Sequence, residues 1–133
     1  MKRLFYYLFF GIAILACSPP SSYQHQLAEV ETVIEENPDS ARALLYEIPF
    51  SLLQEDKEKA LYNLLLTMAD YKLYYPFADD SRIRYSADYY EKSNEKNRLA
   101  TAYYYLGAIN YDELKKKDEA IEYLKKAEEL AGQ

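Results

Sequence analysis

The chain of 133 residues has no tryptophan, one cysteine, one histidine and three glycines. A single cysteine excludes a disulfide bond within the chain. The three glycines, Gly11, Gly107 and Gly132, lie too far apart to form a phosphate-binding loop. His25 stands between two glutamines, a polar setting that favours an exposed residue over a metal ligand or general base. With so few reactive groups, we expect no catalytic centre, no metal site and no cofactor.

The chain also lacks an excess of basic residues. It has 16 Lys and Arg against 22 Asp and Glu, a formal charge of −6. Loss of Lys2 and Arg3 with a leader would leave 14 basic and 22 acidic residues, a charge of −8. Nucleic-acid binding requires a positive surface that displaces counterions, so this balance argues against DNA or RNA as a partner. Half of the residues are hydrophobic, which is too many for a disordered chain.

The first 16 residues are an apolar run behind a basic start. Residues 4–16 carry no charge and follow Lys2 and Arg3. The run is shorter than the roughly 20 apolar residues of a membrane span and has the length of a signal-peptide core. Residues 14–17, Ile-Leu-Ala-Cys, resemble the bacterial lipobox. This resemblance implies that the leader 1–16 is removed and that Cys17 carries lipid, palmitate among its acyl chains, as a membrane anchor.

Residues 17–22 are predicted to be a linker, because Pro19 and Pro20 favour an extended backbone and the serines around them keep it solvated. In Gram-negative lipoproteins that resemble this one, a residue other than Asp after the lipidated Cys, here Ser18, favours the outer membrane. We therefore expect an outer-membrane lipoprotein that faces the periplasm. Two alternatives stay open: an uncleaved N-terminal membrane helix, and a cytosolic protein with a buried N-terminal helix.

From residue 23 onward the apolar residues recur with helical spacing, and no stretch alternates as a half-buried strand would. Asn37 is predicted to cap a second helix that Pro49 ends, and Asp79 and Asp80 to cap a fourth. The third helix is the longest, covering about residues 53–74. The links are short, which implies antiparallel hairpins. The six stripes are Leu27, Val30, Ile34; Ala41, Leu44, Leu45, Ile48; Ala60, Leu61, Leu64, Leu65, Met68, Tyr71; Ile83, Ala87, Tyr90; Leu99, Ala102, Tyr103, Leu106, Ile109; and Ala120, Ile121, Leu124, Ala127, Leu130.

Two of these helices share a pattern at one fixed offset along the chain, which is typical of repeated helical units. The matching pairs are Ala60 and Ala100, Leu66 and Leu106, Thr67 and Gly107, and Tyr71 and Tyr111. In the later copy, Tyr103, Leu106 and Gly107 resemble the signature of the first tetratricopeptide-repeat (TPR) helix. Residues 118–124 with Ala127 resemble the second TPR helix. The clearest match covers residues 100–131.

Residues 23–133 are expected to form a TPR-like helical domain, and the whole chain is similar to the opening of the TPR lipoproteins found in some Gram-negative anaerobes. This resemblance implies an all-α fold, a TPR-like α-solenoid of antiparallel helix hairpins in which Gly107 allows close helix contact. Two departures leave the geometry of the last turn open. The segment from Gly107 to Ala120 is longer by a single position than the family usually has, and residues 114–117 replace the usual glycine.

The resemblance also implies a groove, formed by the first helix of each hairpin, that binds a protein or peptide partner. The last helix carries apolar residues with no polar capping helix after it, so self-association through this end is a further expectation. The alternative is a truncated sensory or regulatory fragment of a longer TPR signalling protein. An enzyme acting on envelope glycans ranks last, because nothing places two carboxylates at hydrolase spacing. The candidate groove residues are Asn63, Thr67, Asp70, Tyr104 and Asn110.

Overall fold

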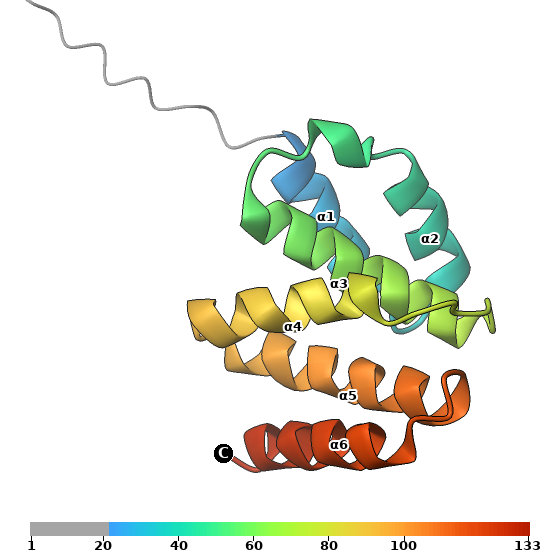
Figure 1. The fold of residues 1–133 in the computed structure, drawn as a ribbon. Coiled ribbons are helices and arrows are strands. Elements are labelled where there is room, and N and C mark those ends of the chain that lie inside the picture. Colours follow the sequence, from blue (N-terminus) through green and yellow to red (C-terminus); the bar gives the residue numbers. More distant parts are fainter. Residues whose placement is uncertain (1–21) are drawn as a thin grey trace, which may run out of the picture.

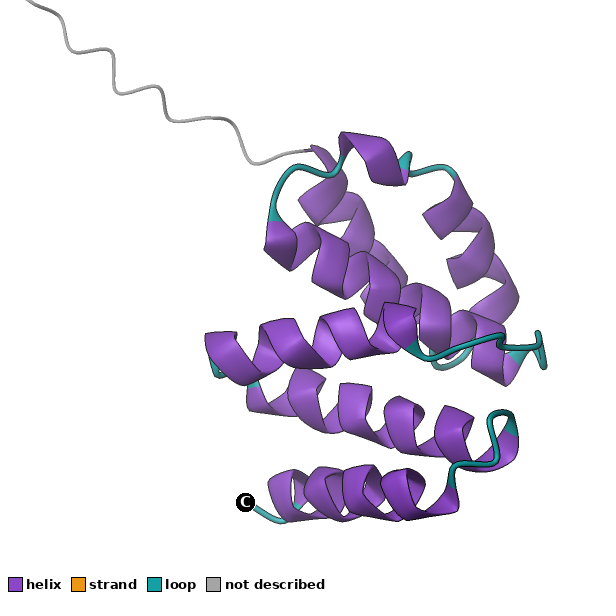
Figure 2. Ribbon diagram, in the orientation of Figure 1, coloured by secondary structure: helices purple, strands orange, loops and turns teal. Residues whose placement is uncertain are grey.

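The computed structural model describes residues 22–133, and every regular element within them is helical (Figures 1 and 2). The all-α prediction is therefore confirmed for this part of the chain. The predicted leader 1–16, Cys17 and the linker up to residue 21 lie outside the described residues. The elements are α1 (Ser22–Val33), α2 (Pro38–Tyr46), the 3-10 helix η1 (Phe50–Leu52), α3 (Asp56–Lys72), α4 (Ser81–Ser93), α5 (Lys96–Asp112) and α6 (Lys117–Ala131).

Consecutive helices lie side by side, from α1 and α2 at one end of the molecule to α6 at the other (Figure 1). Helix α3 is the central element, because it contacts α1, α2, α4 and α5. All of its residues from Ala60 to Asp70 are buried except Asn63. Helix α6 packs almost entirely against α5, which leaves one side of α6 without a neighbouring helix among residues 22–133.

Of the three side chains predicted to cap helices, Asn37 and Asp79 do so and Asp80 does not. The side chain of Asn37 accepts a hydrogen bond from the Ser40 amide at 3.2 Å, and Pro38 occupies the first turn of α2. At α4 it is Asp79 that accepts from the Ser81 amide, at 2.8 Å. The Asp80 side chain makes no cap bond and pairs instead with Arg84 at 2.6 Å. Asp80 is thereby available to join helices.

The third helix is shorter than the sequence predicts. Residues 50–52 form the separate helix η1, and Leu53 is extended and buried, so that α3 begins only at Asp56. At its other end α3 stops at Lys72, because Tyr74 adopts a left-handed backbone with a φ of 60°. The apolar spacing predicted the stripe correctly but could not register the backbone breaks on either side of it.

The α5–α6 turn has the left-handed geometry that glycine usually supplies. Lys115 adopts a φ of 59°, and its ammonium group donates to the carbonyl of Asp112. The turn is closed by the Lys116 amide, which donates to the carbonyl of Asn110 at 2.8 Å. A left-handed lysine therefore replaces the glycine that the TPR resemblance implies, and the hairpin is kept.

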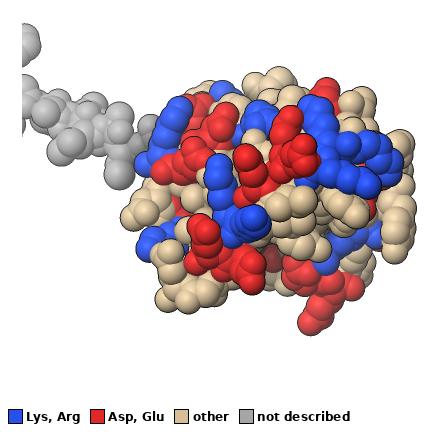
Figure 3. Space-filling model, turned by 60° about the horizontal axis from the view of Figure 1, so that its bottom comes forward, with Lys and Arg blue, Asp and Glu red and all other residues tan. Residues whose placement is uncertain are grey.

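Small residues bring α5 and α6 together. A Cβ added at Gly107 would lie 2.7 Å from Leu124 Cγ and 3.1 Å from the carbonyl oxygen of Ala120. The close helix contact expected at Gly107 is confirmed. The surface seen in Figure 3 carries acidic and basic side chains next to one another, without a large patch of either sign.

Candidate functional site

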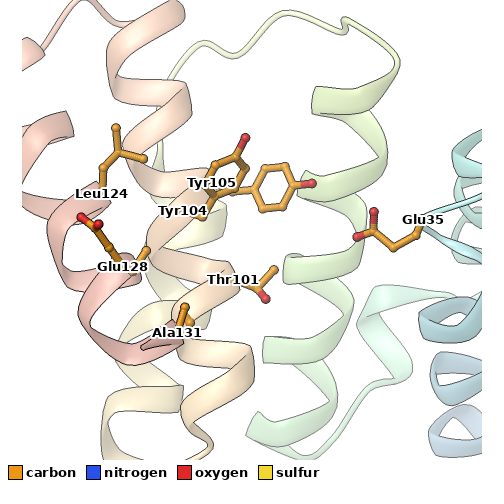
Figure 4. A pocket seen from close by; sticks show the side chains of 9 residues that line it. Glu35, Thr101, Tyr104, Tyr105, Leu124, Glu128 and Ala131 are labelled. Carbon is orange, nitrogen blue, oxygen red and sulfur yellow. The ribbon is translucent and has the colours of Figure 1, made fainter. Parts of the chain in front are cut away.

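An open, mostly apolar hollow lies at the α6 end of the molecule. It has a volume of about 540 Å³ and is formed by α5 and α6, with Glu35 from the α1–α2 turn on the opposite side (Figure 4). We call it the end groove. Helix α5 contributes Thr101, Tyr104 and Tyr105, and helix α6 contributes Leu124, Ala127 and Glu128.

Two neighbouring tyrosines form the floor and the rim of the end groove. The rings of Tyr104 and Tyr105 meet edge-on, with centroids 5.1 Å apart and an interplanar angle of 87°. Tyr105 is buried and also packs edge-on against Tyr71 at 5.5 Å. Burial, and then the negative charge of Glu35, raise the pKa of Tyr105, so its hydroxyl stays neutral. Tyr104 remains 49% exposed and is the ring that a bound molecule would meet.

The end groove has an acidic border. Glu35 faces the two tyrosines across the groove in Figure 4, and Glu128 lies on the α6 side. Glu35 accepts a hydrogen bond from the Lys72 ammonium group at 2.7 Å, yet most of its side chain is exposed. An apolar floor between two carboxylates suits a ligand with an apolar face and basic flanks.

A smaller hollow of about 200 Å³ continues from the end groove between α1, α3 and α5, and shares Glu35 and Thr101 with it. Its floor includes Leu64 and Met68 of α3. Arg98 of α5 reaches across to Glu31 of α1 with two hydrogen bonds, at 2.9 and 2.8 Å. This paired contact holds α1 and α5 together above α3. The hollow that remains between the three helices is therefore small.

The five residues predicted for a groove do not gather on one surface. Tyr104 lines the end groove and Asn63 is half-buried, whereas Thr67, Asp70 and Asn110 are buried. Thr67 donates its hydroxyl proton to the carbonyl of Asn63 at 2.7 Å, one turn back in α3. The sequence repeat predicted which helix carries each of these residues. It did not predict which side of that helix a neighbouring helix covers.

Asp70 and Asn110, which occupy equivalent positions of the sequence repeat, both join neighbouring helices. Asp70 accepts from Arg42 of α2 at 2.7 Å and pairs with Arg82 of α4 at 2.9 Å. Asn110 of α5 donates to Asp80 at 2.9 Å, where Arg84 also binds. These polar contacts lie inside the fold, and the one Asn110 atom without a hydrogen-bond partner, Oδ1, is itself buried, so neither side chain is offered to a partner at the surface.

Burial of the Asp80 carboxyl opposes its ionisation, but the hydrogen bonds from Arg84 and Asn110 outweigh this and lower the pKa of Asp80. Arg84 extends the same network to α6, because it donates to the Tyr123 hydroxyl at 2.6 Å. One carboxylate therefore connects α4, α5 and α6.

Sequence reasoning missed Glu35, Leu124 and Ala127 as groove residues. Leu124 and Ala127 belong to the stripe of the last predicted helix, and the apolar character of that stripe was the available signal. Nothing in the sequence places Glu35 opposite them, because that contact depends on how strongly the series of helices curves.

Fold and groove together define, for residues 22–133, a series of helices with an open apolar groove at one end. Comparison with known protein families, with curated proteins and with solved structures finds no match for this chain. In residues 22–133 no group of three or more His, Cys, Asp or Glu side chains is placed to hold a metal ion. None of the helices formed by these residues has the length and apolar character needed to cross a membrane.

Proposed function

We propose that the protein is a membrane-tethered interaction module, without catalysis, that binds a helical segment of a partner protein in the end groove. The observation that carries this proposal is Tyr104, an aromatic ring that stands exposed beside an apolar groove bordered by two carboxylates. Exposed apolar grooves with a polar border are typical of protein-binding sites.

The proposal includes the arrangement of the helices as a TPR-like α-solenoid of three hairpins. Support comes from positions of α3 and α5 that are equivalent in the sequence repeat. Leu64 is 2% exposed because α1 and α5 lie over it, whereas its counterpart Tyr104 is 49% exposed. The end groove is thus the place where one more helix would pack against α5 and α6, as α5 packs against α3 and α4.

The chemistry of the groove specifies the partner segment. Because its walls are Leu124, Ala127 and two tyrosine rings, the segment needs an apolar face with side chains of moderate size. Because Glu35 and Glu128 border the groove, basic residues at the edges of that face would be favoured. The expected partner is therefore an amphipathic helix with a basic border.

The tether is proposed from the sequence, through the resemblance of residues 14–17 to a lipobox. Cys17 would carry the lipid, and Ser18 favours an outer-membrane location facing the periplasm. The test compares labelling by a palmitate analogue in the wild-type chain and in Cys17→Ala. Label and membrane association should both disappear in the variant, and equal labelling of the two chains would contradict the tether.

Partner binding can be tested by photo-crosslinking in membranes of the native host. A benzophenone amino acid placed at Tyr104 should yield a covalent adduct, and the same group at Tyr74, which is 94% exposed elsewhere, should not yield that adduct. Glu128→Lys should abolish the adduct by reversing a charge at the groove, while Glu129→Lys, the adjacent exposed position, should leave it unchanged. If the adduct contains only two copies of this chain, the groove serves self-association and not a separate partner. If no adduct forms, the proposal is contradicted.

A further inference from the structure

The first described helix begins at the end of the molecule where α3 also begins. Helix α1 begins at Ser22, and Gln24 lines a hollow of about 220 Å³ together with Lys57 and Glu58 from the first turn of α3. The starts of α1 and α3 therefore lie beside each other. Helix η1 comes shortly before α3 in the chain, and Figure 1 shows it at the end where the chain joins α1.

The stretch of chain around η1 exposes three large side chains. Tyr46 is 60% exposed, Phe50 44% and Leu52 55%, all within one short stretch of sequence. They do not belong to a loose loop, since the buried side chains of Ile48 and Leu53 hold the segment. The Phe50 ring also packs on Tyr62 of α3, with centroids 5.3 Å apart. We call residues 46–52 the apolar corner.

Two amides at the end of the apolar corner and just after it are already hydrogen-bonded. The Leu52 amide donates to the carbonyl of Pro49 at 2.9 Å, and the Leu53 amide donates to that of Phe50 at 3.1 Å. Contact with an apolar medium would therefore desolvate side chains without leaving these amides unpaired. Aromatic rings with hydroxyl groups beside aliphatic side chains are the composition that membrane–water interfaces favour.

The proposed tether decides which part of the molecule lies nearest the bilayer. The chain from Cys17 to Ser22 is short, and even when fully extended it spans at most about 18 Å. Helix α3, with 17 residues, is about 26 Å long. The end that carries Ser22 and the apolar corner is therefore held within reach of the membrane surface, whereas the far end of α3 near Tyr74 reaches it only if α3 lies along that surface.

Charge at the apolar corner does not favour anionic lipid. Glu55 and Asp56 follow it, and they pair with Lys57 at 2.9 Å and with Lys59 at 3.9 Å, while Glu47 is exposed. Attraction of basic residues to acidic headgroups is thus absent from this segment. Any membrane contact here depends on the apolar side chains and requires only zwitterionic lipid.

We propose that the apolar corner, residues 46–52, contacts the interface of the lipid bilayer to which the chain is anchored, and so fixes how the folded part faces the membrane. This inference rests on the tether in the proposed function, but not on the end groove. It adds a second membrane contact to the lipid, on the opposite end of the series of helices from the partner-binding groove.

The absence of tryptophan from the chain allows a direct test. Leu52→Trp places a single indole in the apolar corner, and Tyr74→Trp places one at the far end of α3 as a matched control. Each full chain is produced with its own leader, extracted, and reconstituted into phosphatidylcholine vesicles with brominated acyl chains. Fluorescence at position 52 should fall by about twofold relative to unbrominated vesicles, because bromine quenches an indole near the acyl chains, and fluorescence at position 74 should not.

Vesicle flotation separates the two ways in which the inference can fail. If the chains float but position 52 is not quenched, or both positions are quenched equally, the apolar corner does not contact the bilayer and the tether stands. If the chains do not float, the tether fails and this inference fails with it, while adduct formation at Tyr104 is a separate result. Quenching at position 52 that disappears with Cys17→Ala would show that anchoring and corner contact act together.

Discussion

Gly107 illustrates how one residue sets the distance between two helices. Replacing it by Ala would add a methyl group 2.7 Å from Leu124 Cγ and 3.1 Å from the backbone oxygen of Ala120. Alanine favours the helix by up to about 1 kcal/mol over glycine, but overpacking costs about 1–3 kcal/mol. We expect Gly107→Ala to lower the free energy of unfolding by about 1 kcal/mol, measured by urea titration followed by circular dichroism.

Gly132 provides the matched control for this prediction. A Cβ at that position would meet its nearest atom at 3.5 Å, which is an ordinary contact. Gly132→Ala should therefore change stability by no more than about 0.5 kcal/mol. A Gly107→Ala chain more stable than the wild type would mean that α6 moves freely away from α5.

Asp80 should make the stability of the protein sensitive to acid. Its pKa in the folded protein is lowered, although burial opposes this, because Arg84 and Asn110 donate hydrogen bonds to the carboxylate. A lowered pKa means that the unfolded chain binds the proton first, so the stabilisation is complete above about pH 4 and is lost as the pH falls through the folded-state pKa. The urea midpoint of the wild type should thus fall between about pH 5 and about pH 3.

The Asp80→Asn variant should have a smaller decrease over the same range, because the amide cannot be protonated there. It should also be less stable than the wild type at the upper end of that range, where Arg84 loses the nearer of its two charged partners and keeps Glu119 at 3.8 Å. Glu129→Gln, at an exposed position of α6, is the control and should retain the wild-type difference between the two pH values. Identical pH dependence in Asp80→Asn and wild type would remove Asp80 as the acid-sensitive group.

At the scale of whole elements, the α5–α6 turn contains an identifiable strain. Lys115 has a φ of 59°, a conformation that costs an L-residue with a side chain roughly 1–2 kcal/mol and costs glycine nothing. Lys115→Gly should raise the free energy of unfolding by about 1 kcal/mol, and Lys116→Gly, where φ is −92°, should not raise it. Thermal and urea unfolding of the two variants would check this, and a loss of stability in Lys115→Gly would show that the lysine contacts matter more than the backbone.

The helices themselves were largely predictable because their signals are local. Asn37 and Pro38 mark the start of α2, and the stripe Ile83, Ala87 and Tyr90 marks the buried face of α4. Apolar spacing and capping chemistry act over a few residues, so the sequence carries them. The three consecutive tyrosines point in different directions around α5, so that Tyr103 packs on Tyr123 of α6, Tyr105 packs on Tyr71 of α3, and Tyr104 between them is exposed.

Breaks between elements were less predictable, because they depend on tertiary contacts. Helix η1 is stabilised by the packing of Phe50 on Tyr62, which belongs to the following helix, and its own short sequence carries no helical stripe. The left-handed backbone at Tyr74 was likewise not predictable, because the residue is a tyrosine and not the glycine or asparagine that usually adopts this conformation. Single-sequence patterns therefore predicted most of the stripes, but they placed Ile121, which is 46% exposed, on the buried side of α6, and they extended α3 too far at both ends.

At the scale of the molecule, the candidate site was mostly beyond sequence reasoning. The end groove brings Glu35 opposite residues of α5 and α6 that lie far along the chain, from Ala100 to Ala131. Only Tyr104 was identified in advance, because a run of three tyrosines on a helix must turn one of them outward. The other four predicted residues lie on correct helices, but the neighbouring helices cover three of them.

The longest-range polar contact of the described residues suggests how the series of helices is held in its curve. Arg98 joins α5 to Glu31 of α1, 67 residues apart, and α1 otherwise packs mainly against α2 and α3. Both side chains are about one-third exposed, so water weakens the pair, and its removal should cost no more than about 1 kcal/mol. The effect should therefore be visible locally before it is visible in global stability.

We expect Glu31→Gln to speed amide hydrogen exchange in α1 by about two- to fivefold and to leave α6 unchanged, because α6 packs on α5 and not on α1. Raising the salt concentration should reduce this difference, since screening already weakens the ion pair in the wild type. Glu36→Gln, at an exposed position in the following turn, is the matched control and should leave exchange in α1 unaltered. Exchange that rises equally in all helices would mean that the protein opens only as a whole, and that Arg98 stabilises every helix and not the attachment of α1 alone.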